Sequence, residues 1–144
     1  MDIQPATILD LNALRKLEHI CFEKDAWPML DLIAVLTWKD VTRFKAVENN
    51  EMIGFIASDP HRSDGTAWIA IVGVDPRYRR QGIATQLITA CETQTQLPTI
   101  KLVVRLSNEN AINLYRKLGY RNSDVWREYY NDGEDGLVMA KKLY

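Results

Sequence analysis

Residue types that would signal particular kinds of chemistry are scarce in this chain of 144 residues, which has two cysteines and two histidines. Cys21 and Cys91 each fall on an apolar helical pattern, so we expect two buried thiols rather than a disulfide or a catalytic pair. His19 and His61 lack the short spacing of zinc ligands. We therefore expect no metal site.

The chain also lacks a large charge of either sign and a long apolar run. Its formal net charge is −1 at pH 7, which argues against a nucleic-acid binder because such proteins usually present a broad basic face. No stretch approaches 18 apolar residues, and the N-terminal residues do not resemble a secretory signal. We expect a cytoplasmic protein that binds neither nucleic acid nor membranes.

The overall composition is that of an ordinary globular protein, with 47% hydrophobic and 26% charged residues. A chain of this length can bury a substantial core as one domain, residues 1–144. No internal repeat, low-complexity tract or linker divides it. We therefore expect a single globular domain.

Apolar residues recur with periods of two and of about 3.6, which predicts both strands and helices. The expected elements are a short strand at Ile3, helices over 11–21 and up to about 38, strands over 43–48, 52–57 and 68–74, a helix over 83–91, a strand over 100–106, a short helix ending before Gly119, and strands over 120–126 and 137–143. Thr7-x-x-Asp10 resembles a cap ahead of the first helix, residues 49–51 read as the turn of a hairpin, and residues 58–65 read as a polar loop. The order β-α-α-β-β-β-α-β-α-β-β predicts an α+β fold with one mixed, mostly antiparallel sheet and helices on both faces.

The most informative segment, residues 74–84, places Arg77, Arg79 and Arg80 between a strand and a helix. A helix N-terminus carries unpaired N–H groups and the positive end of the helix dipole, so cations there are disfavoured by roughly 0.3–1 kcal/mol each. A bound phosphate would remove this conflict. The alternative interpretation is a helix start whose arginines are simply solvated.

Gly82 strengthens the phosphate interpretation. We expect it in the first turn of the helix, where glycine costs roughly 1 kcal/mol relative to alanine. Without a Cβ, the main-chain N–H groups around it can approach an oxygen-rich ligand closely. The pattern Arg79-x-x-Gly82-x-Ala84 resembles the pyrophosphate loop of the GNAT superfamily of N-acetyltransferases.

A second segment, residues 105–120, reads Arg-x-Ser-Asn-x-x-Ala-x-x-Leu-Tyr-x-x-Leu-Gly-Tyr. It begins with helix-capping residues and ends with Gly119 in the position of a left-handed C-cap. This combination resembles the second acyl-CoA segment of GNAT enzymes. Together with the tail over residues 129–139, it is similar to the RimI-like branch, which acetylates protein N-termini. The resemblance covers the chain from Ile3 almost to Leu143.

The resemblance implies a GNAT fold and acetyl-CoA as the cofactor. The main-chain groups of residues 79–84 would hold the pyrophosphate, the N–H of Val74 would bond the thioester oxygen, and Asn108 would steady the cofactor's arm. The full set of residues expected at the cofactor is Val72, Val74, Arg79, Arg80, Gln81, Gly82, Ile83, Ala84, Asn108, Asn110 and Tyr115.

Tyr115 matches the tyrosine that family members place next to the sulfur, which implies a general acid for the leaving thiolate. Its alternative role is in the core, because it shares an apolar stripe with Leu114 and Leu118. A general base is less evident, since Val103 stands where RimI-like enzymes commonly carry a glutamate and residues 68–71 contain no acid. An α-amine, with a pKa of about 7.7–8.0, needs less help to lose its proton than a lysine at about 10.4. The missing carboxylate therefore favours N-termini as acceptors.

The tail supplies the candidates for the acceptor side. Tyr129 and Tyr130 would wall the acceptor channel, and Glu134 with Asp135 would attract an ammonium group. Sheet packing is the alternative for the tyrosines, and a solvated turn for the acids. The stretch between the first two helices, at Trp27 and Met29, could line the same opening or belong to the core.

The leading hypothesis is direct transfer of an acetyl group from acetyl-CoA to a protein or peptide N-terminal α-amine. One alternative is the same chemistry on a small amine such as a polyamine, an amino acid or an aminoglycoside. Another is a noncatalytic acyl-CoA-binding domain. The sequence leaves the acceptor's first residues, the acyl-chain preference and the oligomeric state open.

Overall fold

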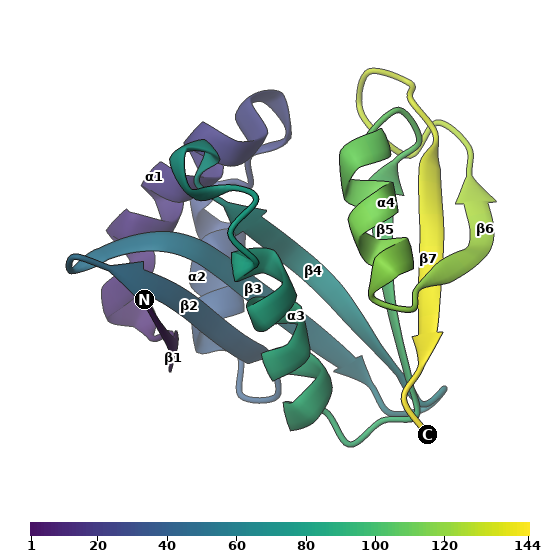
Figure 1. Ribbon diagram of the computed structural model, residues 1–144, viewed down its shortest axis with the longest axis horizontal. Coiled ribbons are helices and arrows are strands. Elements are labelled where there is room, and N and C mark those ends of the chain that lie inside the picture. Colours follow the sequence, from purple (N-terminus) through teal and green to yellow (C-terminus); the bar gives the residue numbers. More distant parts are fainter. The chain divides into compact units, whose positions relative to one another are not determined.

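The computed structural model describes the whole chain, Met1–Tyr144, and contains the expected seven strands and four α-helices in the expected order (Figure 1). The elements are β1 (Asp2–Pro5), α1 (Leu11–Phe22), α2 (Met29–Thr37), β2 (Thr42–Glu48), β3 (Glu51–His61), β4 (Thr66–Val74), α3 (Ile83–Gln94), β5 (Thr99–Arg105), α4 (Glu109–Lys117), β6 (Arg121–Trp126) and β7 (Gly136–Lys142). Three 3-10 turns accompany them: η1 (Ile8–Asp10), η2 (Glu23–Asp25) and η3 (Pro76–Tyr78).

The strands form one mixed sheet in the order β1-β2-β3-β4-β5-β7-β6. The pairs β1/β2, β2/β3, β5/β7 and β6/β7 are antiparallel. Strands β4 and β5 run parallel, with Thr66 opposite Thr99 and Trp68 opposite Lys101. The mixed, mostly antiparallel sheet of the expected α+β fold is confirmed.

Close contacts divide the chain into two compact units, and each is described separately below. Unit 1 comprises Met1–Asp59 and Ala70–Gln96, and unit 2 comprises Pro60–Ile69 and Leu97–Tyr144. Organisation as one domain over residues 1–144 stays a prediction. None of the helices is both long enough and apolar enough to cross a membrane.

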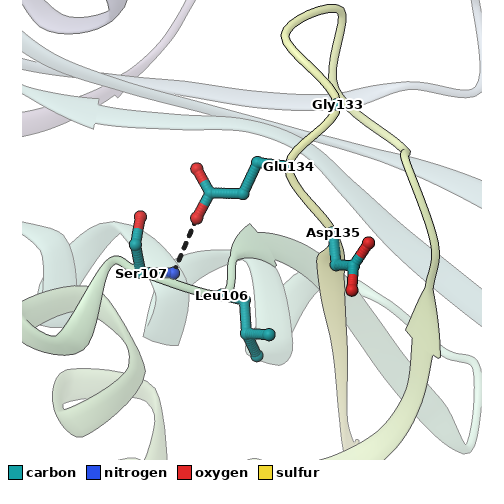
Figure 2. Close-up of a pocket in the computed structure, with 5 residues that line it drawn as sticks. All are labelled: Leu106, Ser107, Gly133, Glu134 and Asp135. Carbon is teal, nitrogen blue, oxygen red and sulfur yellow. Dashed lines mark hydrogen bonds between the residues drawn. The ribbon is translucent and has the colours of Figure 1, made fainter.

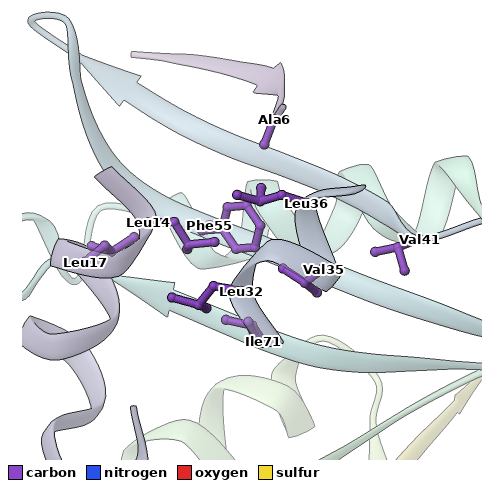
Figure 3. Packing of buried hydrophobic residues seen from close by; sticks show 10 residues of the cluster. Ala6, Leu14, Leu17, Leu32, Val35, Leu36, Val41, Phe55 and Ile71 are labelled. Atoms are coloured by element: carbon purple, nitrogen blue, oxygen red, sulfur yellow. The ribbon is translucent and has the colours of Figure 1, made fainter. Parts of the chain in front are cut away.

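In unit 1, helices cover both faces of the sheet. Neighbouring residues of a strand point to opposite faces. Phe55 belongs to the core cluster under α1 and α2, whereas a Cβ on Gly54 would lie 3.0 Å from Leu87 of α3. The cluster, drawn in Figure 3, consists of Ala6, Leu14, Leu17, Leu32, Val35, Leu36, Val41, Phe55, Ala57 and Ile71.

The start of the first helical region is fixed by local hydrogen bonds. The side-chain oxygen of Thr7 accepts from the N–H of Leu9 at 3.2 Å, and a carboxylate oxygen of Asp10 accepts from the N–H of Thr7 at 2.8 Å. This reciprocal arrangement is a capping box, which satisfies donors that a helix start leaves unpaired. The expected cap is confirmed, and it opens the 3-10 turn η1, which leads directly into α1.

The hairpin between β2 and β3 has a two-residue turn, with φ of 52° at Asn49 and 62° at Asn50. Asparagine tolerates this left-handed conformation, which a two-residue hairpin turn needs at both positions. The expected hairpin is therefore confirmed. The expected loop from Ser58 is wrong, because β3 continues to His61. Ser58 is buried and pairs with Thr42 across the sheet, so tertiary pairing prevails over its polar character.

Candidate functional site

The end of β4 is shaped by Asp75, whose carboxylate is buried in unit 1. One of its oxygens accepts from the main-chain N–H of Arg77 at 2.9 Å, and the other accepts from the guanidinium of Arg77 at 2.8 Å. The hydrogen bond from this guanidinium is the main cause that lowers the pKa of Asp75, although burial opposes it. The ion pair therefore fixes the turn after Val74 and engages one of the three arginines.

The main-chain carbonyl of Val74 accepts two hydrogen bonds. The Nε of Arg79 donates at 3.1 Å, and the thiol of Cys21 on α1 donates at 3.4 Å. Burial is the main cause that raises the pKa of Cys21 to about 11, so the thiol stays protonated. The expectation of a buried apolar thiol is corrected here: Cys21 is half-buried and joins α1 to the last residue of β4, whereas Cys91 is fully buried.

The segment between η3 and α3 contains two left-handed residues, Arg80 with φ of 64° and Gly82 with φ of 78°. Gly82 is the N-cap residue, so it stands just before the first turn of α3 and not within it. A Cβ at Gly82 would meet no atom within 4 Å, so the positive φ is what favours glycine here. Arg80 and Gln81 are exposed, whereas Ile83 is buried. Turns of this kind gather main-chain N–H groups into anion-binding concavities.

In unit 2, the start of α4 uses Asn108 as its N-cap. The side-chain oxygen of Asn108 accepts from the N–H of Ala111 at 3.2 Å. Asn110 is exposed in the first turn of the helix. At the other end, Gly119 has φ of 100°, as expected for a C-cap glycine.

Tyr115 is buried, with 8% of its surface exposed, and its ring lies 6.2 Å from that of Tyr120 in an edge-to-face arrangement. Burial raises the pKa of Tyr115 to about 12. The phenol therefore keeps its proton at neutral pH and can donate it. The buried face of α4 also includes Ile112, which the apolar stripe read from the sequence did not include.

The loop between β6 and β7 is tied to the end of β5 through Arg105. The guanidinium of Arg105 lies 2.7 Å from Glu134, 3.0 Å from Asp132, and 4.2 Å from the centre of the Tyr130 ring. The other oxygen of Glu134 accepts from the N–H of Ser107 at 2.8 Å (Figure 2). The hydrogen bonds from Ser107, followed by those from Arg105, lower the pKa of Glu134. Both of its carboxylate oxygens are thus bonded within the protein.

Figure 2 shows the pocket around this carboxylate, which lies wholly in unit 2. Its lining residues are Leu106, Ser107, Gly133, Glu134 and Asp135. One oxygen of Asp135 accepts from the N–H of Glu128 at 2.9 Å, so this acid also shapes the loop. The pocket therefore combines main-chain groups after β5 with a fixed, negatively charged loop.

Four aromatic rings of unit 2 form a row in which each ring contacts the next. The ring centres are 5.4 Å apart for Trp68 and Trp126, 5.4 Å for Trp126 and Tyr129, and 5.0 Å for Tyr129 and Tyr130. Tyr129 is half exposed. The aromatic contacts of the two tyrosines agree with the packing role, and they leave Tyr129 open to a partner.

Val103, which takes the place of the expected carboxylate, fills space next to Gly136 of β7. A Cβ at Gly136 would lie 2.7 Å from Cγ1 of Val103 and 3.2 Å from Cβ of Tyr129. Glycine is therefore required where β5 and β7 pair at this point. The side chain at position 103 is packed and apolar, so it supplies no acid or base.

Glu18 on α1 is a titratable residue that the interpretation of the sequence missed. It is 1% exposed, and one of its oxygens accepts from the N–H of Trp27 at 3.0 Å. Burial raises its pKa to about 7, while the Trp27 bond opposes the rise. The signal was present in the sequence, because Glu18 stands on the same helical stripe as Leu14, Leu17 and Cys21.

The candidate residues fall in two groups that the structure places within separate units. In unit 1 the cofactor candidates are Val72, Val74 and the consecutive residues Arg79, Arg80, Gln81, Gly82, Ile83 and Ala84. In unit 2 the candidates are Asn108, Asn110, Tyr115, Tyr129, Tyr130 and Glu134. Their individual roles stay predictions.

Known proteins resemble this chain in sequence and in fold. The model of the acetyltransferase (GNAT) family matches residues 11–120. The catalytic subunit of the N-terminal acetyltransferase A complex of Arabidopsis thaliana is 30% identical over an alignment of 148 positions, which covers 98% of this chain and 77% of the plant protein.

Solved structures are similar over nearly the whole chain. The crystal structure of the ribosomal-protein-S18-alanine N-acetyltransferase from Escherichia coli has a TM-score of 0.88 and 27% identity, covering 99% of this chain and 93% of the bacterial one. An aminoglycoside 6'-N-acetyltransferase complexed with coenzyme A has a TM-score of 0.86, covers 100% of this chain and 98% of its own, and is 17% identical. The second likeness indicates the shared fold alone.

Proposed function

Because the chain belongs to the acetyltransferase (GNAT) family and is an acetyl-CoA-dependent N-acetyltransferase, we propose that its acceptor is the α-amine of a protein or peptide N-terminus. The observation that carries this proposal is the similarity over 98% of the chain to an N-terminal acetyltransferase. The tail loop held by Arg105 supports it, since this loop fixes Tyr129 and Tyr130 in unit 2.

In the proposed cofactor site, main-chain N–H groups of residues 79–84 bind the pyrophosphate of acetyl-CoA at the start of α3. The left-handed residues Arg80 and Gly82 and the dipole of α3 favour an anion at this place. The exposed side chain of Arg80 adds charge, whereas Arg77 is engaged by Asp75. Val72, Val74, Asn108 and Asn110 complete the proposed contacts with the cofactor.

In the proposed reaction, the nitrogen of the neutral amine attacks the carbonyl carbon of the thioester. A C–N bond forms and the C–S bond breaks, so the coenzyme leaves as a thiolate that needs a proton. Tyr115 supplies this proton, because burial keeps its phenol protonated at neutral pH. The nitrogen releases one proton as it becomes an amide, and a proton from solvent restores the Tyr115 phenol after it has protonated the thiolate. The N–H of Val74 bonds the thioester oxygen and stabilises the negative charge that develops on it.

On the acceptor side, we assign Tyr129 and Tyr130 to the walls of the channel. Glu134 acts mainly by shaping the loop, because Arg105 and Ser107 already occupy its two oxygens. Its negative charge still favours an approaching ammonium group. A cytoplasmic location and a single domain remain part of this proposal.

A small amine is the second candidate acceptor, because the same fold also occurs in an acetyltransferase named for an aminoglycoside, and the fold does not separate the two acceptors. The two candidates are separated by mass spectrometry of peptides that differ in their first residues, incubated with acetyl-CoA together with free lysine and polyamines. Acetylated peptide α-amines are the expected result. Acetylation of the small amines alone would contradict the proposed acceptor.

A further inference from the structure

The carboxylate of Glu18 is only half satisfied within the protein. One oxygen accepts from the N–H of Trp27, whereas the other has no hydrogen-bond partner although the side chain is buried. A buried polar atom without a partner costs about 1–3 kcal/mol, so such atoms in native proteins call for a water, a ligand or a functional role. The second oxygen of Glu18 is therefore available to a proton donor.

Glu18 also lies close to the end of β4. Cys21 follows it by three residues on α1, and side chains at this spacing have Cβ atoms about 5–6 Å apart. The thiol of Cys21 donates to the carbonyl of Val74 at 3.4 Å, and the ring of Phe22 lies beside Gly73. The charge of Glu18 is also among the causes that raise the pKa of Cys21, so its carboxylate lies near the thiol that contacts the end of β4. Ordered waters can bridge polar groups that do not touch each other directly.

The titration of Glu18 suits a base that works near neutral pH. Burial raises its pKa to about 7, and the bond from Trp27 is the only opposing cause. The titratable and charged groups on α1 and on the elements packed against it are Asp10, Arg15, Lys16, His19, Cys21, Glu23, Lys24, Asp25, Asp31, Asp75 and Arg79. None of them is among the causes that set the pKa of Glu18.

We propose that Glu18 accepts, through water, the proton that the acceptor's α-ammonium group loses before it attacks acetyl-CoA. The ammonium gives one proton to the carboxylate, which becomes a carboxylic acid. The neutral amine then forms the C–N bond while the C–S bond of the thioester breaks, and the nitrogen releases its second proton to solvent. The carboxyl afterwards returns its proton to solvent. Glu18 would thereby take over the work of the carboxylate that Val103 replaces. This inference rests on the proposed function.

The test compares the rate of acetylation at several pH values for the wild type, Glu18→Gln and Glu23→Gln. The substrate is the peptide that is acetylated fastest in the mixed panel. Glu23 is an exposed glutamate on η2, so its substitution removes the same charge from the same region. For Glu18→Gln we expect kcat to fall by on the order of 10²-fold near pH 7. The loss should shrink above about pH 9, where the α-amine is already neutral.

The outcomes separate the inference from the proposed function. If Glu18→Gln lowers the rate equally at every pH, or leaves the pH profile unchanged, the role of Glu18 is overturned while peptide acetylation stands. If the wild type acetylates no peptide, the proposed function and the role of Glu18 are both overturned. The affinity for acetyl-CoA, measured by calorimetry, should be the same in all three proteins.

A second measurement keeps the inference testable should Glu18→Gln fail to fold. The carboxyl carbon of Glu18 can be followed by NMR in wild-type protein labelled with ¹³C-glutamate. Its titration midpoint should fall when the same peptide binds together with coenzyme A, because a nearby ammonium favours the ionised carboxylate. An unchanged midpoint in the complex would overturn the role of Glu18.

Discussion

One carboxylate oxygen of Glu134 lies 2.7 Å from the guanidinium of Arg105 and so joins the β6–β7 loop to the last residue of β5. The two residues are 29 positions apart in the sequence, and each belongs to a different GNAT-like segment. Because Arg105 also faces Asp132 and the Tyr130 ring, one partly buried cation organises most of the loop.

Glu134→Gln should weaken the attachment of this loop to Arg105 without changing the binding of acetyl-CoA. The amide keeps one acceptor oxygen but loses the charge that attracts Arg105. We expect a higher KM for the peptide acceptor and an unchanged Kd for acetyl-CoA. Glu128→Gln, at an exposed position near the start of the loop, is the control. A larger change in cofactor Kd than in acceptor KM would contradict the assignment.

Tyr115→Phe should lower kcat by about 10²–10⁴-fold while the affinity for acetyl-CoA stays the same. The substitution removes only the phenol that is proposed to protonate the leaving thiolate. Tyr120→Phe is the control, because it makes the same chemical change in a buried ring 6.2 Å away. Steady-state kinetics and calorimetry measure the two quantities. An unchanged kcat for Tyr115→Phe would show that another group is the acid.

Gly82→Ala should weaken the binding of coenzyme A. The left-handed conformation costs alanine about 1–2 kcal/mol more than glycine, which corresponds to a roughly 5- to 30-fold change in an equilibrium constant. Gly133→Ala introduces the same conformational strain, since Gly133 has φ of 89° and open space around it. We expect calorimetry to detect weaker binding of coenzyme A to Gly82→Ala and unchanged binding to Gly133→Ala. Equal affinities in both variants would contradict the phosphate site.

Glu18 should make the stability of the protein depend on pH. Its pKa is about 7 in the folded state and 4.5 without burial, so the folded state binds more protons between these values. The free energy of unfolding should therefore fall as pH rises from about 4.5 to 7, by up to about 3 kcal/mol. Glu18→Gln should lack this fall and be the more stable protein at pH 8. Urea unfolding measures both proteins, and parallel pH curves would contradict the burial of an ionisable Glu18.

Local patterns were enough to predict many elements. The Thr7 and Asp10 cap, the two-asparagine hairpin turn and the C-cap at Gly119 depend on neighbouring residues only, and each lies where the sequence indicates. The extension of β3 to His61 was not predictable in this way, because Ser58 is held by its pairing with Thr42. Its polar side chain suggests a loop until the partner strand is known.

The residues of the candidate site likewise differ in whether local sequence was enough to predict them. The arginine segment before α3 and the segment around Tyr115 were recognisable because their residues are consecutive in the chain. Cys21 and Glu18 were not, since their roles depend on contacts with Val74 and Trp27. The packing of Val103 against Gly136 likewise required the register of β5 and β7.

The sequence by itself determined the order of the elements, the family and the turn before α3, because periodicity, caps and positive φ are properties of short segments. Only the tertiary structure decided which charges are free and which are engaged. Arg77 pairs with Asp75, Arg105 with Glu134, and Glu18 keeps one oxygen without a partner. Burial and distance set the pKa of such groups, and both depend on how the chain folds.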